Sequence, residues 1–590
     1  MKKTLVIILL MIVNVMLFAD ARNGIRENKA LEDGSTQSRG FNPVVIYGTN
    51  SVALDTTRKI PGLVSWWDYA TNGQNQHQIV VLGDTVIAAV QYIDSSNAAT
   101  SAGRTMLYQV SYDGGLTWLS DAVQIAPLPL GGAYPDIVPV VLGGNRTAVF
   151  TGRQFSPGSR GFAGVDVLLG AGSVTSTLVP VVGADYFSCW LSSSKIGGVY
   201  QSGDTLFFRK FDYTNNTYDA RQLLALPTVD IDANGRKTVA SSTDGQNVFA
   251  MWYKSTTGLE ALNGKFSTDG GTTFGSTVTV MPSTLIVNGD QITPWFGMDV
   301  AYKPNSNTVS AVFCTQPGDL SGAAQGWKVM YWSPSINGGT PVLIADRTNT
   351  PILADTGYIN NSFSSIQVGM TGLSHPTVAY SDDGNTIYCV FSGIQKDTSS
   401  YGYFFNDLYS SYSTNAGANW SAPVKLSMCT ADGDEIYPTL SKTGNTSSSF
   451  GLLYFNSSFP GSASFTNTTT PRSRNYTMYT RINPTTGGQI PIGITTVSNQ
   501  VPSKYSLKQN YPNPFNPSTN IRFELKSASV VNIKVFDIAG REVAQLVKGE
   551  NVQAGIHEVK FDASKLASGV YFYKLETPDF TETKKMMLIK

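Results

Sequence analysis

Short apolar segments recur along most of the chain at a roughly regular spacing. An apolar residue opens a short segment at seven positions: Ile79, Ile137, Cys189, Val239, Val300, Val378 and Leu440. Subtraction of neighbouring positions gives intervals of 58, 52, 50, 61, 78 and 62 residues. A turn with Gly, Asp or Asn and a second apolar segment follow each of them, and then a third segment. Without helical periodicity between them, these segments predict units of three or four antiparallel strands.

Seven such units between residues 41 and 483 predict the blades of a β-propeller, an all-β fold. The long interval before Val378 leaves six blades as an alternative. Three units share one pattern at the start of the first strand, in the segments Tyr134–Ile137, His375–Val378 and Tyr437–Leu440. Each has proline as its second residue. Proline is tolerated at a strand entrance because its missing amide costs no ladder hydrogen bond there.

The last part of the chain, residues 504–590, follows a different pattern. Apolar residues alternate with polar ones at Val531, Ile533 and Val535, and residues 537–540 form a predicted hairpin turn. About seven strands in fewer than ninety residues favour a small immunoglobulin-like sandwich. Two polar stretches without periodicity, residues 22–40 and the Gly-, Pro- and Thr-rich residues 484–503, are predicted to be an N-terminal segment and a linker.

Both ends of the chain indicate export. Residues 1–21 combine two lysines, an apolar run and small residues before a cleavage point, which predicts a secretory signal peptide. No later run is long enough for a transmembrane helix. The segments Tyr505–Leu525 and Lys584–Lys590 closely resemble the type A C-terminal sorting domain of the type IX secretion system. The resemblance implies a bacterial protein that passes through the periplasm, binds the type IX machinery through residues 504–590 and reaches the cell surface or the medium.

Two turns carry a further motif. Residues 111–118 and 267–274 match the pattern Ser-x-Asp-x-Gly-x-Thr-Trp/Phe, and residues 413–420 and 335–341 are weaker copies. The matching residues are Ser111, Asp113, Gly115, Thr117, Trp118, Ser267, Asp269, Gly271, Thr273 and Phe274. This motif resembles the Asp-box, or BNR repeat, of sialidase-like propellers. Its aspartate bonds backbone amides and its glycine takes a positive φ, so the motif is structural. In that family the boxes lie away from the active site.

The catalytic pattern of sialidases is not legible in this chain. The family uses an arginine triad, a tyrosine–glutamate pair and an aspartate acid, with the first arginine in an Arg-Ile-Pro sequence. The nearest match, Arg58–Pro61, has lysine directly before Ile-Pro. Lysine cannot provide the bidentate grip of a guanidinium. Three carboxylates near strand entrances, Asp136, Asp299 and Glu435, are the candidate catalytic acids, with backbone bonding as the structural alternative.

Composition restricts the remaining chemistry. Charged residues make up 14% of the chain and the formal net charge is zero, so nothing indicates a nucleic-acid partner. Three histidines and four widely spaced cysteines provide no metal motif, and no cofactor is predicted; calcium stays open without a supporting motif. We expect at most one disulfide.

Equivalent positions before the first strands predict a ring of ligand-binding side chains at a propeller face: Tyr134, Tyr186, Arg236, His375 and Tyr437. Aromatic faces and polar donors are typical of carbohydrate sites. Packing between blades is the structural alternative for the tyrosines. The sequence therefore favours a secreted or cell-surface protein that binds carbohydrate or another surface ligand. An exo-glycosidase of sialidase type and an adhesive protein without a small ligand are the alternatives.

Overall fold

The structure is a computed structural model of the whole chain. It describes residues 58–65, 77–93, 103–126, 130–156, 158–172, 174–181, 185–203, 205–225, 236–256, 259–318, 326–352, 372–398, 404–426, 428–429, 433–457, 475–498 and 500–590. The predicted signal peptide and the polar segment 22–40 lie outside these residues, as do the first residues of the unit predicted from residue 41.

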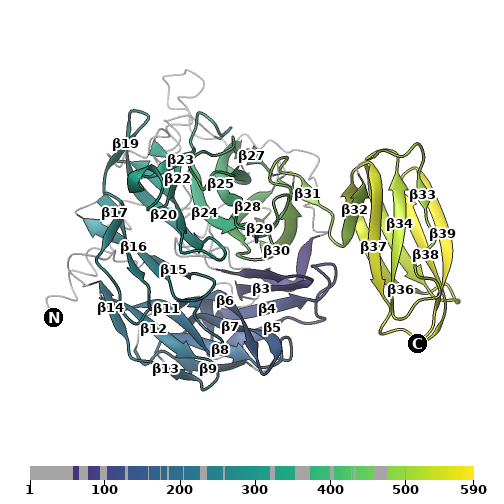
Figure 1. Cartoon of the computed structure of the whole chain (residues 1–590), viewed down its shortest axis with the longest axis horizontal. Coiled ribbons are helices and arrows are strands. Elements are labelled where there is room, and N and C mark those ends of the chain that lie inside the picture. Colours follow the sequence, from purple (N-terminus) through teal and green to yellow (C-terminus); the bar gives the residue numbers. More distant parts are fainter. Residues whose placement is uncertain are drawn as a thin grey trace, which may run out of the picture.

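Consecutive antiparallel sheets make up the first part of the fold (Figure 1). The first four sheets are β2(Ile79–Leu82) β3(Thr85–Tyr92) β4(Thr105–Ser111) β5(Val123–Ala126); β6(Gly132–Leu142) β7(Asn145–Gln154) β8(Arg160–Asp166) β9(Val174–Leu178); β10(Phe187–Trp190) β11(Lys195–Ser202) β12(Thr205–Asp212) β13(Thr217–Tyr218) with β14(Gln222–Ala225); and β15(Lys237–Ser241) β16(Val248–Thr256) β17(Leu259–Ser267) β18(Val278–Met281).

The next two sheets continue in chain order, and the third brings both ends of the array together. They are β19(Leu285–Val287) β20(Asp290–Tyr302) β21(Val309–Pro317) β22(Val329–Trp332) β23(Val342–Ala345), with the 3-10 turn η3(Asn337–Gly339); and β24(Leu373–Tyr380) β25(Ile387–Thr398) β26(Phe404–Ser413) β27(Val424–Lys425). The last sheet is β28(Asp434–Leu440) β29(Phe450–Ser457) β30(Asn475–Ile482) with β31(Gln489–Ile490) and, from the other end, β1(Lys59–Ser65). The described strands form an all-β array of mostly four-stranded antiparallel sheets, consistent with a propeller.

The sheets pack face to face through apolar side chains that alternate along the strands. Between the first two sheets, for example, Ile87 and Tyr108 of one sheet form a cluster with Phe150 and Phe162 of the next. Each of these side chains is buried, and full burial of such a side chain stabilises a fold by about 1.5–3 kcal/mol. The seven apolar residues that predict first strands all lie in innermost strands: β2, β6, β10, β15, β20, β24 and β28.

Four innermost strands contain the same irregularity at their entrance. Tyr134, His375 and Tyr437 have φ values of 59°, 49° and 54°, and Gly297 has 125°. The strand register shifts at each of these positions, so each is a β-bulge. In three of them proline follows the bulged residue, where no ladder bond requires its amide. The bulge sets the direction of the side chains that follow it.

The C-terminal part consists of two sheets that face each other, to the right in Figure 1. One is β32(Ile494–Ser498) β37(Gly555–Asp562) β34(Ser518–Leu525) β33(Ser506–Leu507), and the other is β36(Glu542–Val552) β35(Ser529–Phe536) β38(Gly569–Thr577) β39(Phe580–Leu588). One apolar cluster fills the space between them, and Val531, Ile533 and Val535 are all buried in it. The predicted alternation of β35 is confirmed.

The structure differs from the sequence prediction in residues 484–503. Strand β31 pairs with β30, and β32 pairs with β37. The C-terminal pair of sheets therefore begins at Ile494, and only residues 491–493 separate the strands of the two parts. The Gly and Pro content of this segment concealed these two short edge strands. Arg58 also donates to Glu550 of β36, so the two parts share a buried ion pair.

Candidate functional site: a cavity in the central channel

The turns that match the repeated motif share one set of hydrogen bonds. Ser111 Oγ donates to Asp113 Oδ1 (2.7 Å) and accepts from the N–H of Gly115 (2.7 Å). Asp113 Oδ1 also accepts from the N–H of Thr117 (2.8 Å). The corresponding bonds occur in residues 267–273 and, with Asn415 in place of aspartate, in residues 413–419. The aspartate or asparagine side chain accepts bonds within each turn, and all three turns follow the third strand of their sheet.

Two of the three candidate carboxylates converge on one histidine in the centre of the array. The backbone N–H of His77 donates to Oδ1 of Asp136 (2.6 Å), and its Nδ1 lies 3.5 Å from the same oxygen. Its Nε2 lies 3.8 Å from Oδ1 of Asp299. Oδ2 of Asp136 accepts from the N–H (2.8 Å) and Oγ (3.1 Å) of Ser188. The first three sheets thus meet at Asp136.

Asp299 connects the remaining side of the channel. Its Oδ2 accepts from Thr377 Oγ1 (2.8 Å), from the N–H of Val378 (2.9 Å) and from Nζ of Lys442 (2.5 Å). Lys442 Nζ also donates to the carbonyl of Val378 (2.5 Å). We call the four side chains of His77, Asp136, Asp299 and Lys442 the channel network.

Burial and charge act differently on the two carboxyl groups of the channel network. Burial raises the pKa of Asp136, although His77 and the Ser188 N–H oppose this. Burial would also raise the pKa of Asp299, but Lys442 and His77 outweigh it and hold that pKa below its ordinary value. Asp299 is therefore an ionised partner of an ammonium group, whereas Asp136 is more readily protonated.

The third candidate, Glu435, lies apart from this network. Its Oε1 accepts from Nδ2 of Asn456 (3.1 Å), and it is fully buried. Its carboxylate forms a compact group with Asp407 and Cys429, whose ligand atoms lie within 4.8 Å of one another. Lys425 Nζ lies 2.6 Å from Oδ2 of Asp407, so a cation already pairs with one of the two carboxylates. Burial holds the pKa of the Cys429 thiol well above its ordinary value, which disfavours the thiolate that binds metals.

The predicted ring of ligand-binding side chains is buried. Exposure is 5% or less for all five: Tyr134, Tyr186, Arg236, His375 and Tyr437. The rings of His375 and Tyr437 pack edge to face at 4.9 Å, and Tyr186 OH donates to the carbonyl of Arg209 (2.7 Å). Burial lowers the pKa of His375 to about 3. The His375–Tyr437 contact joins two sheets, as in the structural alternative that the sequence left open, whereas the Tyr186 bond stays within one sheet.

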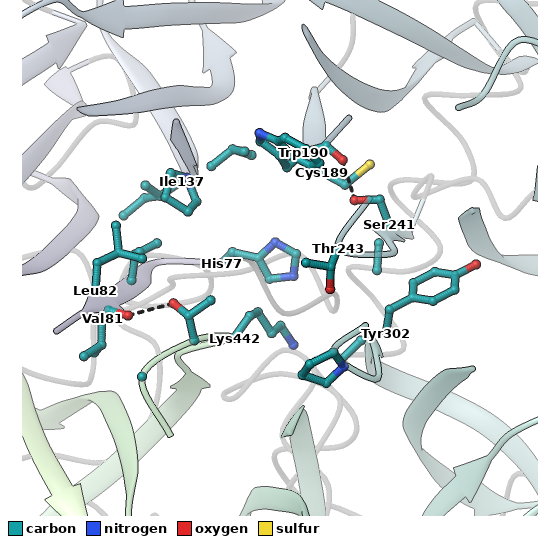
Figure 2. Close-up of a pocket in the computed structure, with 18 of the residues that line it drawn as sticks. His77, Val81, Leu82, Ile137, Cys189, Trp190, Ser241, Thr243, Tyr302 and Lys442 are labelled. Atoms are coloured by element: carbon teal, nitrogen blue, oxygen red, sulfur yellow. Dashed lines mark hydrogen bonds between the residues drawn. The ribbon is translucent and has the colours of Figure 1, made fainter. Parts of the chain in front are cut away.

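A cavity of about 760 Å³ lies on the other side of the channel network (Figure 2). His77 and Lys442 extend toward its centre, and Ser188 also borders it. The residues that follow in the innermost strands form the walls, among them Val81, Ile137 and Trp190. The turns to the second strands form the mouth: Gly83, Thr243, Asn305, Asp382 and Gly444.

The mouth of the cavity lies on the same face as the motif turns. The N–H of Gly114 in the first motif turn donates to the carbonyl of Asp84, beside Gly83 (2.7 Å). The N–H of Gly270 in the second donates to the carbonyl of Gln246 (2.8 Å). The cavity mouth and these two motif turns therefore lie at the same end of the sheets.

Sequence reasoning found Asp136 and Asp299 but missed their partners. His77 and Lys442 lie outside the predicted strands, and nothing in their local sequence marks them. Trp190 and Tyr302, two aromatic residues in the cavity wall, end innermost strands. Their position just before a turn is a usable signal, because turn-proximal residues surround one end of a propeller channel.

Comparison with known proteins identifies the C-terminal part. Residues 509–590 match the secretion system C-terminal sorting domain. This domain, of the type IX system, directs the protein to the outer surface or the medium and implies contact with the secretion machinery. None of the helices in the described part of the chain is long and apolar enough to cross a membrane. No curated protein matches the chain.

Solved structures provide only distant matches. A protein of unknown function from Dyadobacter fermentans is 12% identical over 60% of this chain and all of that one, with a TM-score of 0.34. A prolyl endopeptidase is 11% identical over 67% of this chain, which spans 48% of that structure, with a TM-score of 0.25. A Hadza microbial sialidase is 10% identical over 54% of this chain and 73% of that one, with a TM-score of 0.25.

Proposed function

We propose that this secreted protein is a seven-bladed β-propeller of the sialidase-like, Asp-box type that binds carbohydrate in its channel cavity. Its sorting domain is the immunoglobulin-like sandwich of residues 494–590. The cavity of about 760 Å³ carries the proposal, because its volume falls within the range of small-molecule sites, roughly 300–1,000 Å³. Secretion to the cell surface or the medium brings the cavity into contact with extracellular glycans.

The chemistry of the walls supports a sugar ligand. Trp190 contributes aromatic surface, on which the apolar face of a sugar ring can pack, and the buried Tyr302 also lines the cavity. His77, Lys442 and the exposed Arg146 contribute hydrogen-bonding groups. Most innermost strands are also end strands of their sheets, so one backbone edge of each is open to the channel. Open N–H and C=O groups suit a ligand that carries many hydroxyls.

Binding fits the geometry better than hydrolysis. A glycosidase needs two carboxyl groups in contact with the scissile bond, about 5–9.5 Å apart. The side chains of Asp136 and Asp299 are only 2% and 1% exposed and are occupied by His77, Ser188 and Lys442. Glu435 lies in a separate buried group.

One observation favours the alternative, an exo-glycosidase of sialidase type. The guanidinium of Arg153 lies 5.7 Å from the ring centroid of Tyr134 and pairs with Asp185 (2.6 Å). Arg104 acts on the same tyrosine electrostatically. Two arginines and an acid around a tyrosine at the strand entrances partly match the sialidase pattern. Tyr134 is 5% exposed, however, which argues against a nucleophile.

The test is a glycan screen with the mature protein, followed by mass spectrometry of the unbound fraction. Retention of intact glycans supports binding, and release of monosaccharide supports the hydrolase. If neither retention nor release is seen, the adhesive role is favoured. Val141→Trp, at the cavity mouth and 54% exposed, is expected to abolish retention. Leu223→Trp is the matched control, because Leu223 on β14 is 50% exposed and is not among the described residues that line the cavity.

A further inference from the structure

We propose that the channel cavity recognises the end of a glycan chain and not its interior; this inference rests on the proposed function. The observation behind it is that, in the described part of the chain, the channel network lies across the inner end of the cavity and the turns between first and second strands surround its mouth. A polymer cannot pass through such a cavity. It can only enter it with one end.

The channel network lies across the inner end because it joins strands of six of the seven sheets at one level. Asp136 of β6 contacts Ser188 of β10 and the segment before β2. Asp299 of β20 contacts β24, and Lys442, just after β28, spans the distance to both. In the described residues, four side chains therefore link six of the seven sheets in the first part of the fold. The carboxylates at this level are at most 2% exposed, so no open passage reaches them.

Beyond the channel network lie the strand entrances, whose described side chains are buried. The strand-entrance side chains of five sheets are 5% exposed or less, including Tyr186, Arg236 and His375. None of them borders the cavity among the described lining residues. Among the described residues, the channel network therefore lies between the cavity and these buried side chains at the strand entrances.

The cavity itself changes in character with depth. Residues close to the channel network, such as His77 and Ser188, are polar, and Lys442 Nζ reaches down from the mouth to the same level. The walls are mainly apolar, with Val81, Ile137 and other aliphatic residues. A ligand that enters end-on would present its terminal hydroxyl or carboxylate to the polar floor while its ring faces pack against the walls. An internal segment also carries hydroxyls, but the chain continues on both sides of it, so it cannot reach the floor of a cavity that is closed at one end.

The mouth lies on the face of the Asp-box turns, so the predicted end-binding site is separate from the strand-entrance face. This separation distinguishes it from a sialidase-type site around Tyr134. Variants at the mouth should therefore leave any activity at Tyr134 unchanged, and variants at Tyr134 should leave end binding unchanged.

The experiment uses the full mature chain and an array of structurally defined glycans, followed by titration with length-fractionated forms of each glycan that binds. End recognition predicts that bound glycans share a terminal residue, and that the association constant per chain does not change with chain length. Recognition of an internal segment predicts instead that the association constant per chain rises in proportion to length. A cyclic form of the same glycan, which has no ends, should fail to compete.

The outcomes separate the two proposals. Length-independent binding that Val141→Trp abolishes and Leu223→Trp leaves unchanged supports end recognition. Binding that grows with length, or competition by the cyclic form, overturns end recognition but leaves carbohydrate binding intact. Absence of binding to every glycan on the array overturns the proposed function and the inference together. Binding that Val141→Trp does not affect places the glycan elsewhere and also overturns the inference.

Discussion

Removal of the ammonium group from the channel network should destabilise the fold strongly. In Lys442→Met, Asp299 loses its cationic partner at 2.5 Å but stays buried, with its side chain 1% exposed. Removal of one partner of a buried ion pair costs about 3–5 kcal/mol, because a buried charge is left uncompensated. The Lys442 side chain is 23% exposed, so we expect the lower end, about 3 kcal/mol.

Urea unfolding followed by tryptophan fluorescence measures this change in the free energy of unfolding. All nine tryptophans lie before residue 421, so the signal reports the sheet array and not the sorting domain. The matched control is Lys195→Met, which breaks an ion pair of similar length (2.7 Å) whose side chains are 33% and 37% exposed. An exposed pair contributes at most about 1 kcal/mol. In a double-mutant cycle, Asp299→Asn should remove most of the cost of Lys442→Met.

The dependence of the free energy of unfolding on pH is a second, independent check on the direction of this effect. The pKa of Asp299 in the folded protein is held below its ordinary value, so its contribution is fully present above about pH 4 and is lost as the pH falls further. The deficit of Lys442→Met should therefore be largest near neutral pH and should shrink in acid. The reasoning is refuted if the deficit of Lys442→Met is below about 1 kcal/mol or equals that of Lys195→Met. It is also refuted if the deficit grows as the pH falls.

Three further perturbations test other parts of the structure. Bonds from Thr273 lower the pKa of Asp269 to about 2, so Asp269→Asn should lower the melting temperature at pH 7. Calorimetry should show that this deficit disappears only as the pH falls toward 2. Glycan binding is the control and should not change in this variant. Arg58→Ala should free the sorting domain from the array, seen as a larger radius of gyration in solution scattering, and Glu550→Gln should reproduce this; an unchanged radius would contradict the contact. Reductant should not change the melting temperature, because the cysteines are all free: Cys189, Cys314, Cys389 and Cys429. Maleimide should label Cys189, Cys314 and Cys389 only after unfolding, because these three thiols are buried.

The sequence predicts the strands well because their burial follows a local period. An apolar residue at the start of each unit marks the innermost strand, since that strand is packed by neighbouring sheets on both faces. The proline pattern likewise locates three of the four entrance bulges. The fourth, at Gly297, has no proline, and the strand pairing alone reveals it.

The site was only half predictable, because its contacts are not local. Equivalence between repeats selects Asp136 and Asp299, which occupy the same position two residues after a bulge. It cannot select Lys442, which lies 143 residues from Asp299 and reaches it across the channel. The ring of binding residues stays a prediction. The bulges place Tyr134 and its counterparts between the sheets, whereas the sequence analysis predicted that they line an open mouth.

The cavity and the sorting domain depend on the same closing seam of the array. Strand β1 completes the last sheet, and Arg58, directly before it, bonds Thr480, the carbonyl of Ile490 and Glu550. At the inner end of the seam, Thr443 Oγ1 donates to the carbonyl of Val81 (2.7 Å), and both residues line the cavity (Figure 2). A ligand held between the first and last sheets should therefore stabilise the closed ring. Because the ion pair with the sorting domain requires the same closure, a chain with an open ring would lack both the cavity and the docked sorting domain.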